Sequence, residues 1–182
     1  MKKAYASAIF VCVFVLTVAA QEGQDNPFRK AKVGDFVGYK VTTSVMGKSI
    51  DVEMKQVVSA KTDKEATLTT TATVMGMQAP PRDTKIDLTK EYDPIAAATQ
   101  AKGKGTFEKT GTGKEKLSVN GKNYDCEWIK GKVVADAGGK KLESDVQIWF
   151  SKALPLTGMV KMSMKSNFLE MTMEATDFGS EK

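Results

Sequence analysis

Residues 37–45 read VGYKVTTSV, residues 50–55 read IDVEMK, and between them the turn-forming residues 46–48 read MGK. In both runs apolar or β-branched residues occupy every second position, and polar residues or glycine lie between them. Successive side chains of a strand point to opposite faces, so this alternation predicts two strands that each bury one face. The short turn should join them as an antiparallel hairpin.

The same alternation continues along most of the chain. It recurs at 67–74, 86–88, 117–119, 124–128, 142–150, 160–164 and 169–175. Turn signals separate these runs, and Asn120-Gly121 is the strongest of them because both residues tolerate a positive φ. About nine or ten strands joined by short turns predict a mainly β protein, with a single antiparallel sheet curled into a half-barrel or barrel.

Two stretches do not alternate. Residues 93–100 are helix-like, because Asp93 suits a cap, Pro94 suits the first helical position, and three alanines follow Ile95. Residues 102–113 are rich in glycine and lysine, which indicates a mobile loop or a loose edge of the sheet. The sequence therefore predicts at most one or two short helices beside the sheet.

The first twenty residues carry the features of a secretory signal. Lys2 and Lys3 precede an apolar run at 8–16, and small residues follow up to Ala20. The run is short for a membrane span, and no later run is long enough, so we expect no transmembrane segment. We expect a signal peptide at 1–20, a flexible segment at 21–32 and one antiparallel β domain at 33–179, exported to the periplasm or the extracellular space.

Several kinds of site are missing from the sequence. There is no histidine, which excludes Ser-His-Asp and Cys-His catalysis and the usual zinc sites. Removal of the signal would leave Cys126 alone, between Tyr124 and Trp128 on one strand face, as a buried structural thiol. Lysines mostly alternate with acids, which does not favour nucleic-acid binding. We therefore expect no enzyme activity, no cofactor and no histidine- or cysteine-based metal site.

The methionines are the most distinctive feature. The sequence has ten, and pairs such as Met162/Met164 and Met171/Met173 lie on one strand face. They suit an ordinary core, an adaptable apolar cavity, or a Cu(I) site, since thioethers are soft and flexible ligands. As the lining of an apolar cavity the candidate residues are Met54, Trp128, Val160, Met162, Met164, Leu169, Met171 and Met173.

A resemblance to known proteins rests on two segments. Residues 146–161 contain a strand with IWFS at 148–151, a short loop with Pro155, and GMVK at 158–161 opening the next strand; residues 124–128 read YDCEW. These segments resemble exported β proteins of the lipoprotein-localisation (LolA-like) superfamily. The resemblance implies a curved half-barrel whose concave apolar face, covered by a few helices, receives a lipid or acyl chain. Residues 93–100 are the one stretch that could supply such a cover.

Three functions remain open from the sequence. The first is an exported, non-catalytic binding protein that carries a lipid or another apolar ligand between its methionine-bearing strands and residues 95–98. The second is a structural or interaction protein of the cell envelope, with a self-filled core, which contacts a protein partner through the threonine row at 67–73 and the lysine-rich loop. The third is a Cu(I)-binding protein that uses the paired methionines.

Overall fold

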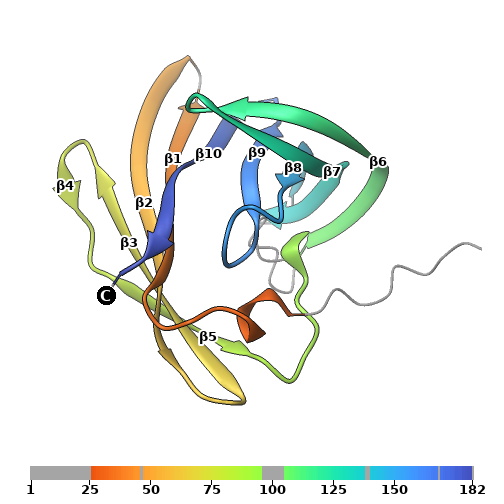
Figure 1. Cartoon of the computed structure of the whole chain (residues 1–182). Coiled ribbons are helices and arrows are strands. Elements are labelled where there is room, and N and C mark those ends of the chain that lie inside the picture. Colours follow the sequence, from red (N-terminus) through yellow and green to blue (C-terminus); the bar gives the residue numbers. More distant parts are fainter. Residues whose placement is uncertain (1–25, 46, 96–104, 138–139, 168, 182) are drawn as a thin grey trace, which may run out of the picture.

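The computed structural model describes residues 26–45, 47–95, 105–137, 140–167 and 169–181. Ten strands form one antiparallel sheet (Figure 1). They are β1 (Asp35–Val45), β2 (Lys48–Lys61), β3 (Glu65–Val74), β4 (Met77–Gln78), β5 (Arg82–Asp87), β6 (Gly105–Val119), β7 (Lys122–Ala137), β8 (Lys140–Phe150), β9 (Met159–Lys165) and β10 (Leu169–Ser180). The predicted fold class, a single antiparallel sheet of nine or ten strands curled into a half-barrel, is confirmed.

The first and last strands of the sequence lie side by side in the middle of the sheet. The spatial order is β4-β3-β2-β1-β10-β9-β8-β7-β6, and β5 pairs with the same strand as β4, namely β3. The β1–β10 ladder runs from Asp35 opposite Ser180 to Val45 opposite Leu169, with one irregularity between Gly38 and Tyr39. All other neighbours along this order are consecutive in the chain, so β1–β10 is the ladder that joins the two halves.

The sheet curls until one end of it approaches its middle. Three strands separate β6 from β10 in the sheet, yet the Asn120 side-chain amide, in the β6–β7 turn, donates to the Ala175 carbonyl of β10 at 2.7 Å. The Lys122 ammonium lies 5.1 Å from the centre of the Phe178 ring, also on β10. The tip of the β6–β7 hairpin therefore reaches back across the sheet.

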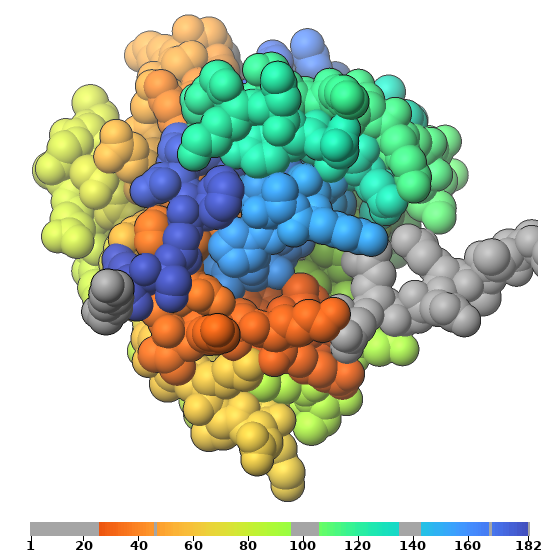
Figure 2. Space-filling model, in the orientation of Figure 1, coloured from red at the N-terminus to blue at the C-terminus, as the bar shows by residue number. Residues whose placement is uncertain are grey.

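The core lies on the concave face. Tyr39 and Val37 of β1, Ile148 of β8, and Val160 and Met162 of β9 are at most 2% exposed. Residues outside the sheet close one end of this face: Phe28 from a short 3-10 helix (Pro27–Arg29), Leu88 after β5, and Leu154 and Leu156 from the β8–β9 loop. In Figure 2 that loop (blue) sits between the β6–β7 hairpin (green) and the N-terminal residues (orange).

The structure differs from the expected flexible segment at 21–32. Residues 26–31 are packed onto the sheet, where Phe28 is fully buried and the Asn26 side chain donates to the Asp87 and Lys90 carbonyls, both at 3.1 Å. One aromatic residue and one amide hold this stretch in place. Such isolated contacts need no repeating apolar pattern, so the sequence of the stretch gave no sign of its packing. The predicted signal at 1–20 lies outside the described residues.

The glycine- and lysine-rich stretch also differs in part from its prediction. Residues 105–113 are not a loop but the first half of β6, which pairs with β7 and forms one edge of the sheet, as the alternative of a loose edge anticipated. Of the expected helix at 93–100 the structure describes only the start, where the Asp93 carboxylate accepts from the Ile95 backbone N–H at 2.9 Å. Residues 96–104 lie outside the described part.

Aromatic rings lie over glycines on neighbouring strands of the curled region. Trp128 of β7 lies over Gly113 of β6, its direct partner, and Phe107 of β6 lies over Gly131 of β7. Glycine at such positions lets a strand bend sharply, and the facing ring restores the apolar contact that glycine itself lacks. The two glycine–aromatic pairs are therefore part of how the β6–β7 hairpin curls.

We predict that Gly131→Ala destabilises the protein by roughly 1–3 kcal/mol, because the new methyl would collide with both the Glu108 backbone oxygen and the Phe107 ring. Gly111→Ala is the matched control on the paired strand. Its methyl would lie 3.4 Å from the Trp128 ring, an ordinary contact, and it should change stability by less than about 1 kcal/mol. Urea unfolding measures both, and equal losses would contradict the assigned packing.

Candidate functional site

The strand registers bring the predicted methionines together on the concave face. Met173 lies opposite Val41 on one side and Met162 on the other, and Met162 lies opposite Ile148. One step along the strands, Met171 lies opposite Thr43 and Met164, and Met164 lies opposite Val146. Because directly opposed residues share a face, Met162, Met164, Met171 and Met173 form one block of four thioethers, which we call the methionine block.

Burial within the methionine block is uneven. Met162 is 1% exposed and belongs to the core, whereas Met164, Met171 and Met173 are only partly buried and pack against the edge of that core. Met54 of β2, opposite Tyr39, is also partly buried and packs against the core. The concave face thus has a closed end, covered by the chain's own loops, and an open end where methionine side chains keep some exposure.

The other predicted site residues divide between the two faces. Val160 is fully buried on the core side, and Leu169 lies opposite Val45 at the open end, where it is partly buried. Trp128 lies on the opposite face, because its partner is Trp149 while its neighbour Ile129 pairs with Ile148 of the core. The alternation of 124–128 suggested Trp128, but it did not reveal that the sheet's buried face changes along β7.

Tyr39 is the polar side chain at the heart of the closed end. Its hydroxyl is buried and has no hydrogen-bond partner among the described residues; Thr157 is close, but not in hydrogen-bonding geometry. Burial raises the pKa of Tyr39 to about 12, opposed in part by the Thr157 hydroxyl. Burial, with Tyr39 and Asp93 nearby, also raises the pKa of Tyr92, whose ring meets Phe28 edge-on at 5.3 Å.

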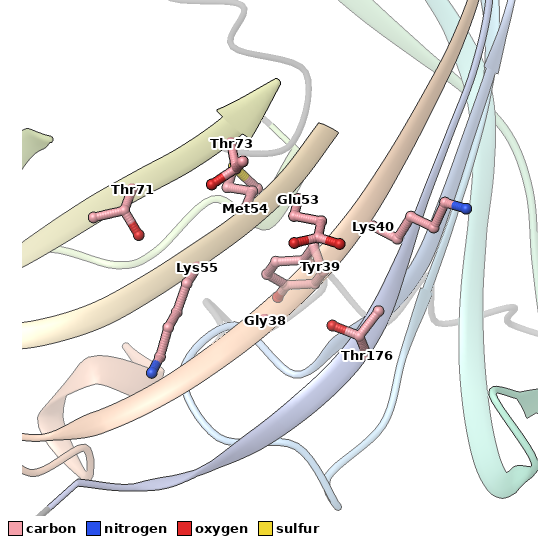
Figure 3. A pocket seen from close by; sticks show the side chains of 9 residues that line it. All are labelled: Gly38, Tyr39, Lys40, Glu53, Met54, Lys55, Thr71, Thr73 and Thr176. Carbon is pink, nitrogen blue, oxygen red and sulfur yellow. The ribbon is translucent and has the colours of Figure 1, made fainter. Parts of the chain in front are cut away.

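A pocket of about 420 Å³ lies on the outer face of the sheet (Figure 3). Gly38, which has no side chain, and the bulged Thr176 leave room between rows of polar side chains on β1, β2 and β3. Its lysines have partners already: Lys40 pairs with Asp51 at 3.0 Å, and Lys55 pairs with Glu181. Sequence reasoning found the threonines of this face but not the pocket, because the bulge leaves no sequence signal.

The described residues offer little for catalysis or ion binding. Cys126 is 3% exposed. Burial raises the pKa of its thiol, and the negative charges of Glu115 and Asp125 raise it further, so the thiol stays protonated and is a poor nucleophile. Within the described ranges no three His, Cys, Asp or Glu side chains come together as a metal site would require. Nor does any helix in them have the length and apolarity to cross a membrane.

Comparison with solved structures identifies the fold. A Bacteroides fragilis protein with a YmcC-like fold, described as exported, superposes with a TM-score of 0.55 at 8% identity, covering 82% of this chain and 97% of that one. MucB (TM-score 0.42, 9% identity, 87% of this chain and 56% of that one) and LprF from Mycobacterium bovis (0.38, 13%, 87% and 91%) are more distant. The LolA-like fold that the sequence resemblance implied is confirmed.

At the level of sequence, no family model matches the chain. No curated protein matches it either. The similarity is therefore one of fold alone.

We predict that Tyr39→Phe flattens the alkaline limb of the stability profile. Because the folded state raises the Tyr39 pKa from 10.0 to about 12, the neutral phenol stabilises folding fully below pH 10, and this stabilisation is lost as the pH rises toward 12. Urea unfolding from pH 8 to 12 should show the natural protein losing on the order of 2–3 kcal/mol more than the variant. Parallel profiles would contradict the buried, unpartnered hydroxyl.

Proposed function

We propose that this protein is an exported, non-catalytic binding protein that holds a lipid or another apolar chain against the open end of its concave face. The observation that carries the proposal is the methionine block, with three of its four side chains only partly buried. Flexible thioethers adapt to apolar ligands of varied shape, and apolar ligand sites are typically concave with few polar groups.

The surrounding residues support this choice of ligand. Val41 and Val52 continue the row of Met173 across β1 and β2, so the apolar surface extends over several strands. Among them these registers place two polar residues, Thr43 beside Met171, and Lys48 opposite Val45 at the outer end of the face. A surface of this composition offers an acyl chain extensive apolar contact.

The closed end of the same face matches the self-filled core that the second hypothesis expects. Phe28, Leu88, Leu154 and Leu156 occupy the closed end, where the Tyr39 hydroxyl has no hydrogen-bond partner among the described residues. This packing supplies stability, and it limits a ligand to the open end. The alternative of a purely structural or interaction protein of the envelope would require the open end to be covered by a protein partner instead.

A second candidate function is Cu(I) binding by the methionine block. Two directly opposed pairs, Met162 with Met173 and Met164 with Met171, bring four thioethers to one face of the β9–β10 hairpin. Cu(I) favours such soft ligands, and an exported protein could meet copper outside the cytoplasm. No imidazole or thiolate accompanies these methionines among the described residues, which favours the apolar ligand.

We predict that the mature protein extracted under native conditions carries lipid, detected by mass spectrometry, and takes up a fluorescent fatty acid. Met171→Gln with Met173→Gln should weaken uptake at least about tenfold, because an amide against an acyl chain loses its hydration without a partner. Thr172→Gln, on the same strand but the opposite face, is the matched control. Absence of both lipid and uptake in the natural protein would refute the proposal.

Replacing all four methionines of the block with leucine separates the two candidates. Leucine keeps volume and apolarity but removes the thioether, so fatty-acid uptake should stay within about threefold of the natural protein. Cu(I) binding, measured by competition with a chromogenic chelator, should disappear if the thioethers are its ligands. Unchanged copper binding would exclude the block as a copper site, and lost uptake with an intact fold would count against the lipid.

A further inference from the structure

Exposed apolar side chains gather at one end of the sheet. Among the described residues, the large hydrophobic side chains that stay exposed are Val45 (44%), Ile50 (45%), Met75 (81%), Met77 (71%) and Val33 (55%). The first four belong to two neighbouring hairpin tips, those of β1–β2 and β3–β4, whereas Val33 precedes β1 at the other end. We call Val45, Ile50, Met75 and Met77 the apolar rim.

The register places the two tips level with one another. Val74 lies opposite Val52 on β2 and opposite Met77 on β4, so the turn at Met75 and Gly76 comes level with Ile50. Val45 lies opposite Lys48 across its own hairpin and opposite Leu169 on β10. The apolar rim thus spans neighbouring strands at the open end of the concave face.

Met75 is an unfavourable choice for folding alone. Its φ is 51°, followed by 80° at Gly76, in a two-residue turn where asparagine, aspartate or glycine is preferred at the first position. A long apolar side chain there is both strained and hydrated, since it is 81% exposed. A local rule broken without a gain in packing is a sign that the side chain meets something outside the chain.

The charges around the rim suit a lipid surface. Lys48 lies in the β1–β2 tip with no ion-pair partner among the described residues. The nearby acids face the outer side, and two of them are paired: Asp51 with Lys40 at 3.0 Å, and Glu170 with Lys165 at 3.7 Å. Protruding apolar side chains beside an unpaired cation match the interface of an anionic bilayer.

The rim is also continuous with the proposed binding face. One register row runs from Met77 through Val74, Val52 and Val41 to Met173, and every residue in it is apolar. An acyl chain that leaves a bilayer at the rim can follow this row to the methionine block without crossing a polar strip. A protein partner would have no need for such a path.

We propose that the apolar rim docks the protein on the surface of an anionic membrane, with the tips of β1–β2 and β3–β4 inserted among the lipids, so that the concave face opens toward the bilayer. The path from rim to methionine block rests on the proposed function. The docking itself rests on the rim's exposure, turn geometry and charge.

Vesicle flotation of the mature protein tests this docking. The protein should float with phosphatidylcholine vesicles that contain phosphatidylglycerol, and less with phosphatidylcholine alone. Ile50→Ser, Met75→Ser and Met77→Ser combined should weaken binding at least about tenfold, and Lys48→Gln should weaken it about fivefold on the anionic vesicles only. Val33→Ser, the exposed apolar residue at the opposite end, is the matched control and should bind like the natural protein.

Two further measurements keep the outcomes separate. Fatty-acid uptake from solution should survive in the rim variant, since none of its substitutions touches the methionine block. In the natural protein, uptake without vesicle binding would overturn the docking and spare the binding function, whereas vesicle binding without uptake would do the reverse. If light scattering shows that the natural protein forms a dimer that the rim variant loses, and vesicles do not bind, the rim is an interface between two copies and the membrane proposal is wrong.

Discussion

The pairing of β1 with β10 organises the whole molecule. The other ladders join strands that follow one another in the chain, except for β3–β5, which skips only the two-residue strand β4, so each half could form by local pairing. The β1–β10 ladder joins residues 35–45 to residues 169–180 and must be closed across almost the entire described chain. It sets the register between the halves, and with it which side chain of one half lies beside which of the other. Closing so long a loop costs entropy that only the completed core returns.

The two ends of the concave face follow from this register and from the loops around it. At the level of Tyr39 and Ala175 the face is covered by Phe28, by the β8–β9 loop and by the β6–β7 tip that Asn120 attaches to β10. At the level of Thr43 and Met171 no such cover is seen in the described part of the chain, and burial falls accordingly. The same strands therefore build a packed core at one end and an apolar surface at the other.

Period-two alternation was sufficient to predict the strands, the Asn120-Gly121 hairpin and the buried Tyr124 and Cys126, because each is a local property. Alternation did not predict the first half of β6, where glycines stand in for apolar residues beneath the Trp128 ring. Nor did it predict the packing of residues 26–31, whose burial depends on one aromatic side chain. It assigned the methionines to one face of each strand. That they form a single block follows from the β9–β10 hairpin, which is local as well. That Trp128 lies on the other face depends on the coiling of β7, which leaves no pattern in the sequence.

The choice between core and cavity for the methionines has a physical answer in the gradient of burial. A methionine buried as completely as Met162 contributes like any core residue, and leucine or isoleucine would serve there with better-defined packing. Met164, Met171 and Met173 gain less from burial and keep the freedom of three side-chain torsions, which weakens packing and suits a surface that must adjust to its ligand. The methionines are thus most informative where they are least buried, because there stability alone gives no reason for a flexible thioether. A face with that property, opening at an exposed apolar rim, is better suited to holding an acyl chain than to completing a core.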